Sequence, residues 1–200
     1  MSATFGWSET NTVSVTVTDS LSNVNFGNAD SPNLTPASNP IAAGQNSFEK
    51  WLRGKFSGSF TSVANLRFWM SVGSYVTGES IKAAVNASYA TPVSTTSAVA
   101  TVAVPTSEGS ALVPNAPSTN PDYSGYITMQ LQTTVATPPG AVNQKTFTLK
   151  SLLVNNLQQL LLLVATLVMH VAVSVEALVD KSYQIWYNML MGNTEERLAS

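Results

Sequence analysis

Short runs in which hydrophobic and polar residues alternate recur throughout the first 150 residues. Thr12–Thr18 alternates strictly, with threonines on one face and Val13, Val15 and Val17 on the other. A period of two is that of a strand with two different faces, so this run predicts a strand with its valines on one face. Leu66–Val72 predicts a second strand, because it is dense in aromatic and aliphatic side chains.

Further strands are expected between loops rich in proline and glycine. Phe48–Phe60 predicts a strand pair or one bent strand, because its glycines permit a bend. Ser94–Val104 predicts a weaker strand, from its β-branched residues. Tyr126–Thr134 alternates cleanly, and a turn then leads to a partner strand beginning at Phe147, which predicts a C-terminal hairpin. The residues expected to point inward here are Ile127, Met129 and Leu131, and Phe147 and Leu149 begin the partner strand.

This succession of short strands indicates the fold class. About seven strands separated by turn signals predict a mostly β domain, either a β-sandwich or a jelly roll, with a barrel as the alternative.

The composition of the chain changes near Lys150. All ten prolines and ten of the eleven glycines precede this residue, whereas eleven leucines follow it and seven precede it. Proline and glycine punctuate turns and are costly inside helices, so their loss predicts one long element in place of many short ones. We therefore expect a β domain over residues 1–150 and an oligomerisation segment over residues 151–200, with the boundary between Thr148 and Leu152.

The C-terminal segment has an apolar repeat with spacings of four and three residues, which predicts a helix. The repeat consists of Leu153, Leu157, Leu160, Val164, Leu167, Val171 and Leu178. A second apolar row widens this face, and a helix with so broad an apolar face needs partners in water. We therefore expect a homo-oligomer, and the width of the face favours a trimer.

Two other interpretations of this segment remain open. Val171–Ala177 also alternates with a period of two, so a strand could replace the helix after about Met169. Leu152–Val175 has no charged residue and is long enough to cross a bilayer as a helix. Because asparagine, glutamine, serine and histidine interrupt this stretch, an oligomer core is favoured over a membrane span.

The charge of the chain narrows the classes of partner. Charged residues make up 10% of the sequence, against ~25% in ordinary soluble domains, and the net charge is −2. The lysines and arginines are scattered singly, so we expect no nucleic-acid binding, which draws on clustered cations. A surface with few charges suits packing against other proteins, because few charges must be desolvated at the contact.

The sequence has no cysteine, which excludes disulfides and thiol nucleophiles.

Residues that could support catalysis are sparse. The sole histidine, His170, lies inside the leucine-rich segment, where a structural role is favoured. The acidic residues of the first 150 positions never pair within one short segment, and the sequence contains no nucleotide-binding, metalloprotease, calcium-loop or nucleophile-elbow motif. We therefore expect a protein that is not an enzyme and that uses no metal or cofactor.

Aromatic residues offer the remaining candidate site. Trp51, Phe56, Phe68 and Trp69 are expected to fill the core, although exposed Trp and Tyr could instead stack on sugars. Trp7 lies in a polar N-terminal segment and is harder to place in the core. Because aromatic residues are enriched at protein contacts, Trp7 is expected to be an anchor inserted into a partner.

Several segments of the β domain resemble small virion proteins of tailed bacteriophages, of the decoration or cement type found on the outside of the head. These segments are Asn25–Asn28, Asn46–Trp51, Leu66–Trp69, Tyr89–Val93, Tyr126–Thr134, Thr137–Gly140 and Gln144–Lys150. The resemblance implies a β-sandwich that oligomerises, often as a trimer, and clamps neighbouring capsid subunits. The leucine-rich segment departs from this pattern, since such proteins typically end soon after the last strand.

The leading hypothesis is therefore a structural protein of the capsid exterior, made in the host cytoplasm, that binds the major capsid protein or other virion subunits. The departure at the C-terminus leaves the neck, the tail and a fibre base open as other positions in the particle. A carbohydrate-binding or receptor-binding module and a membrane-anchored surface protein are the alternatives.

Overall fold

The computed structural model describes residues 3–93, 100–118, 122–138 and 144–154. Within them the chain is mostly β, as the sequence predicts, and its one helical element is the short 3-10 turn η1 (Glu108–Ser110). The strands are β1 (Thr4–Asn11), β2 (Thr16–Asp19), β3 (Lys50–Ser57), β4 (Ser62–Val72), β5 (Glu79–Asn86), β6 (Val102–Ala103), β7 (Asp122–Tyr123), β8 (Tyr126–Thr133) and β9 (Thr146–Val154).

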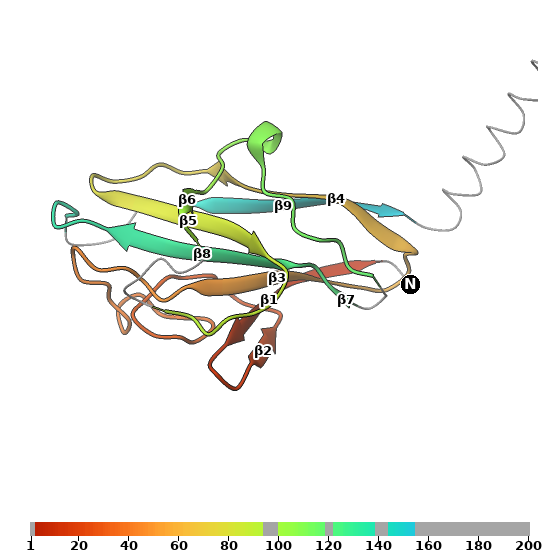
Figure 1. Cartoon of the computed structure of the whole chain (residues 1–200), viewed down its shortest axis with the longest axis horizontal. Helices are drawn as coiled ribbons and strands as arrows, with labels where there is room; N and C mark the ends of the chain where they lie inside the picture. The colour runs from red at the N-terminus through yellow and green to blue at the C-terminus, as the bar shows by residue number, and fades with distance from the viewer. Residues whose placement is uncertain (1–2, 94–99, 119–121, 139–143, 155–200) are drawn as a thin grey trace, which may run out of the picture. The chain divides into compact units, whose positions relative to one another are not determined.

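The strands form two antiparallel sheets (Figure 1). The larger sheet has the order β2-β1-β3-β8-β5-β6, with β7 also paired to β3. The smaller sheet consists of β4 and β9. Strands that are distant in the sequence therefore lie side by side, above all β3 beside β8 and β4 beside β9.

The main hydrophobic core lies between the two sheets. Leu52, Ile127 and Met129 from the larger sheet pack with Phe68 and Met70 of β4, and all five side chains are buried. Alternate residues of a strand point to opposite faces, so the positions between these residues lie on the face turned away from β4 and β9. A second cluster joins Phe56, Val63 and Leu66 at one end of the sheets.

Several predicted strands are confirmed. Leu66–Val72 lies within β4, and Tyr126–Thr134 corresponds to β8 with Ile127, Met129 and Leu131 buried as expected. Phe48–Phe60 contains the single strand β3. The predicted burial is confirmed for Phe56 and Phe68, which lie in the two hydrophobic clusters, and for Trp51, which is buried on the opposite face of the larger sheet. Trp69, also expected in the core, is only partly buried.

The strand predicted over Thr12–Thr18 is confirmed only in part, because Thr16–Thr18 lies in β2 and the residues before it do not form a strand. Thr12–Val15 forms the turn of a hairpin between β1 and β2, and Thr12 and Val15 adopt positive φ angles of 64° and 56°. Val13, Val15 and Val17 are 80%, 52% and 41% exposed. Of the three valines only Val17 lies in the ladder of β1 and β2, opposite Thr10, and β2 pairs only with β1 among the described strands.

The predicted C-terminal hairpin is wrong. β9 does not pair with β8; it pairs with β4, with Phe147 opposite Met70 and Leu149 opposite Phe68. β8 instead lies between β3 and β5. Within the smaller sheet, Phe147 stacks on Phe68 of the neighbouring strand, with ring centroids 5.8 Å apart.

The last strand runs past the boundary that the composition predicts. β9 continues to Val154, and Leu153 lies opposite Val63 and packs on the second cluster. Leu153 therefore belongs to a strand, because the alternation that begins at Phe147 and Leu149 continues through it. The other residues of the predicted helical repeat lie outside the described residues; they are Leu157, Leu160, Val164, Leu167, Val171 and Leu178.

Candidate functional site

The hairpin formed by β1 and β2 is the candidate site, and a buried ion pair lies at its base. Nζ of Lys50 in β3 is 2.9 Å from Oε1 of Glu9 in β1, and the two side chains are 1% and 0% exposed. Lys50 Nζ also donates to the backbone oxygen of Ser31, at 2.8 Å. Burial raises the pKa of Glu9, and the attraction of Lys50 with the hydrogen bond from Asn11 offsets only part of this effect.

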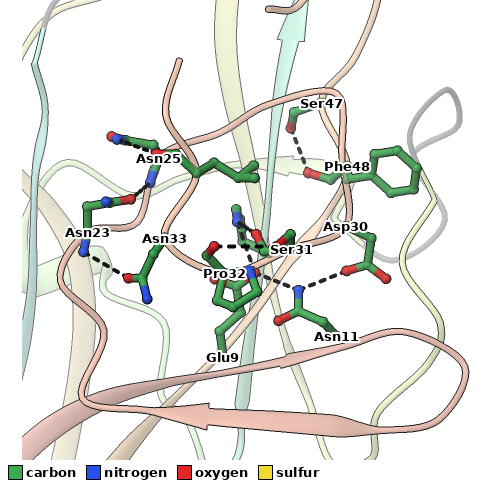
Figure 2. A network of polar contacts seen from close by, with 12 residues as sticks. Glu9, Asn11, Asn23, Asn25, Asp30, Ser31, Pro32, Asn33, Ser47 and Phe48 are labelled. Atoms are coloured by element: carbon green, nitrogen blue, oxygen red, sulfur yellow. Dashed lines mark hydrogen bonds and ion pairs between the residues drawn. The ribbon is translucent and has the colours of Figure 1, made fainter. Parts of the chain in front are cut away.

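Asn11 links this polar network to Asp30 (Figure 2). Asp30 in turn contacts Thr12, the first residue of the turn. Nδ2 of Asn11 donates to Glu9 Oε1 at 2.7 Å and to Asp30 Oδ1 at 2.8 Å. The backbone N–H of Thr12 donates to Asp30 Oδ2 at 2.7 Å. The first residue of the turn is therefore bonded to the Asp30 carboxylate, which also accepts a hydrogen bond from the buried side-chain amide of Asn11.

Tyr89 fixes the same turn from the other side of the sheet. Its hydroxyl donates to the backbone oxygen of Thr12 at 2.8 Å. Burial, together with the negative charge of Asp30, raises the pKa of Tyr89, so the hydroxyl keeps its proton and remains a donor. Thr12 is therefore held through both its N–H and its carbonyl group.

The tip of the hairpin presents an apolar, uncharged surface. Residues 12–18 contain no charged side chain, and their three valines are exposed, Val13 the most at 80%. Positive φ angles at the β-branched residues Thr12 and Val15 cost of order 1–3 kcal/mol each. Such strain persists only where the surroundings impose it, and here the network around Asp30 and Tyr89 does so.

Trp7, the predicted partner anchor, lies in β1. Its ring packs against the main core, edge-on to Phe68 with centroids 6.2 Å apart and edge-on to Phe5 at 5.4 Å. β1 looks polar because its last four residues, from Ser8 to Asn11, are polar and still buried. Trp7 is thus partly buried against the core, where its polar neighbours make it hard to place from the sequence, and its role as a partner anchor stays a prediction.

A second polar surface lies on the face of the larger sheet turned away from β4 and β9. There the guanidinium of Arg53 lies between the rings of Tyr123 and Tyr126, 4.1 Å and 4.6 Å from their centroids. Trp51 lies beneath Tyr126 and Tyr89 in edge-on contact and is almost fully buried. Sequence analysis did not single out Arg53, because β3 and the segment from β7 to β8 are far apart in the chain.

Metal-binding clusters and membrane-spanning helices are both absent from the part of the chain that the structure describes. No group of three or more His, Cys, Asp or Glu side chains in that part of the chain is placed to hold a metal ion. Nor does that part contain a helix of the length and apolar character needed to span a membrane. The stretch Leu152–Val175, for which a membrane span was weighed, lies almost entirely outside it.

Comparison of the chain with protein families, with curated proteins and with solved structures returned no match. The functional interpretation therefore rests on the residues themselves.

Proposed function

We propose that this chain is a non-enzymatic structural protein of a virion, of the head-decoration type, which binds neighbouring capsid subunits and stabilises the shell. The observation that supports the proposal is the β1–β2 hairpin, an uncharged valine tip on a base fixed by buried polar contacts. Exposed apolar groups on a pre-ordered element favour association, because little conformational entropy is lost on binding.

The wider fold is compatible with this role. Two antiparallel sheets with a shared core support the expected β-sandwich, a rigid scaffold on which a binding loop keeps its position. The segments that resemble decoration proteins include parts of β3, β4, β8 and β9, which build that scaffold. Self-association through the C-terminal segment remains part of the proposal.

Heating purified particles with and without the protein, while measuring DNA release, tests the cementing role. Particles that contain the wild-type protein should release DNA at a higher temperature. Identical release temperatures would rule out a stabilising function on that shell.

The hairpin itself is tested by Val13→Asp, which places a charge at the tip without disturbing the core. We expect capsid binding to weaken at least tenfold, about 1.4 kcal/mol, because the charge must be desolvated at the contact. The matched control is Val135→Asp, since Val135 is 89% exposed and lies in the turn after β8. Equal binding by the two variants would exclude the hairpin as the docking element.

A further inference from the structure

The guanidinium of Arg53 contacts two aromatic rings but forms no ion pair with a described residue. It lies on β3, one residue after the core residue Leu52, and so points to the opposite face of the larger sheet. The rings of Tyr123 and Tyr126 flank it at 4.1 Å and 4.6 Å, within the range of cation–π contacts. Two rings against the guanidinium limit its movement. Its N–H groups can then donate hydrogen bonds only in the plane of the guanidinium, to an acceptor at its edge.

Those donors find no acceptor in the described part of the chain. Nε of Arg53 is buried and has no hydrogen-bond partner there. The ion pairs of that part use lysines, at Lys50, Lys55, Lys145 and Lys150, and none involves Arg53. A guanidinium prefers a planar, bidentate acceptor such as a carboxylate, and that partner is missing.

The charged residues near Arg53 do not supply an acceptor for its guanidinium. Lys55, two residues along the same face, is paired with Asp19, and the hydroxyl of Tyr123 donates to the same carboxylate at 3.0 Å and 3.1 Å. Burial opposes ionisation, but hydrogen bonds from Lys55, Ser8 and Tyr123 outweigh it and hold the pKa of Asp19 below its ordinary value. Asp19 is thus a charged partner for Lys55 and fixes the Tyr123 ring, while the positive charge of Arg53 remains uncompensated.

The groups around Arg53 favour a sugar over a protein surface. Tyr89 lies 6.0 Å from Tyr126, and Asn86 is opposite Tyr126 in β5; all three are partly exposed. Phenol rings present apolar faces to the C–H groups of a sugar, and an amide can exchange hydrogen bonds with its hydroxyls. The large exposed hydrophobic residues that a protein contact would use, such as Val13 and Val135, lie elsewhere.

We propose that Arg53, between Tyr123 and Tyr126, binds the carboxylate of an acidic saccharide, with the sugar ring packed against the exposed parts of the tyrosines. This binding site is separate from the hairpin tip, and the inference does not rest on the proposed virion function. Binding to a shell through the hairpin tip and binding of acidic sugars at Arg53 are compatible, because the valines of the tip take no part in the sugar site; Tyr89 alone contributes to both, through its hydroxyl to the turn and through its ring to the sugar site.

Calorimetric titration of the full chain with two probes, trigalacturonic acid and sialyllactose, tests the proposal. At least one probe should bind, and its methyl ester, which lacks the charge, should bind at least tenfold more weakly. Absence of binding by both probes would overturn the proposal, as would equal binding of an acid and its ester.

Variants locate the site. Arg53→Lys keeps the positive charge but removes the planar donor pair, so binding should fall at least tenfold. Arg67→Lys, at an exposed arginine of β4, is the matched control and should bind like the wild type. Should Arg53→Lys fail to fold, judged by circular dichroism, Tyr123→Leu replaces it and should also lose at least tenfold. Undiminished binding by a folded variant of either kind would exclude this site.

Discussion

The ion pair between Lys50 and Glu9 shows how single residues shape this site. Removing two charges from water costs several kcal/mol per ion, and their mutual attraction returns that cost only when further hydrogen bonds are present. Here Asn11 and the backbone oxygen of Ser31 provide them. The pair therefore contributes less to net stability than to fixing how β1, β3 and the loop around Ser31 meet.

Replacing Lys50 by Met should leave Glu9 buried without its cation. We expect the free energy of unfolding at pH 7 to fall by about 3–5 kcal/mol. The folded-state pKa of Glu9 already lies above 4.5, because burial favours its neutral form. As the pH falls from 7 through that pKa, the folded state takes up a proton before the unfolded state does, so this loss should shrink. Urea unfolding at pH 7 and pH 5 measures the difference.

The double variant Glu9→Gln/Lys50→Met is the control for this prediction. It removes both charges, so its stability should lie closer to that of the wild type than to that of Lys50→Met. Its stability relative to the wild type should also lack the recovery at low pH seen for the single variant. The same deficit at both pH values in the single variant would contradict the assignment of the raised pKa to Glu9.

Gly54 is a second residue on which the packing depends. A Cβ atom there would lie 2.9 Å from side-chain atoms of both Leu149 and Phe5 and 3.0 Å from Phe56. Gly54→Ala should therefore destabilise the fold by about 1–3 kcal/mol through overpacking. At Gly6, in the adjacent strand β1, a Cβ atom would meet nothing within 4 Å, and Gly6→Ala should be neutral or stabilise by about 0.5–1 kcal/mol. Thermal unfolding compares the two, and equal melting temperatures would contradict the packing argument.

In the hairpin of β1 and β2, the positive φ angle of Thr12 is stabilised by hydrogen bonds to Asp30, which is distant in the sequence. Asp30 accepts hydrogen bonds from Asn11 and from the N–H of Thr12, so Asp30→Ala leaves two partly buried donors without an acceptor. We expect a loss of about 1–3 kcal/mol, concentrated in the hairpin, because the positive φ of Thr12 is then no longer imposed. Hydrogen exchange of the amides in residues 12–18 should accelerate.

Glu108→Ala is the control for the Asp30 variant. Glu108 forms an exposed ion pair with Lys150, and such surface pairs contribute about 0–1 kcal/mol. Its hairpin amides should exchange at the wild-type rate. If Asp30→Ala also left these amides unchanged, the hairpin would be ordered by contacts other than the Asp30 network.

The elements also show what the sequence alone can predict. β4 and β8 were predictable, because buried aromatic and aliphatic residues alternate along them for a full strand length. β1 was missed because it buries polar residues, whose partners, Lys50 for Glu9 and Asp30 for Asn11, are distant in sequence. The valines of the hairpin were recognised as a pattern, but whether they face a core depends on sheet order, which alternation does not encode.

At the scale of the whole molecule, the sequence predicts two sheets but not how they are connected. The change of sheet after β8 follows from the pairing of Phe147 and Leu149 with β4, and no local signal distinguishes this from a hairpin. Arg53, Tyr123 and Tyr126 likewise meet only because β7 and β8 lie beside β3. Sites assembled across strands are therefore predicted less well than the strands that carry them.

We expect the segment that follows β9 to determine the state of assembly, and its six remaining repeat positions lie outside the described residues. Each buried leucine in a shared seam contributes about 1.5–3 kcal/mol, so several chains gain enough to associate. We expect a trimer that loses its assembly in Leu160→Asp/Val164→Asp, because the new charges would be buried without partners. The β domain up to Val154 should stay folded, since its core does not use these residues.

Analytical ultracentrifugation measures the mass of the assembly, and Gln158→Asp/Thr166→Asp adds the same charges off the seam as a control. A wild-type monomer in aqueous buffer, or a seam variant of unchanged mass, would exclude assembly through this segment.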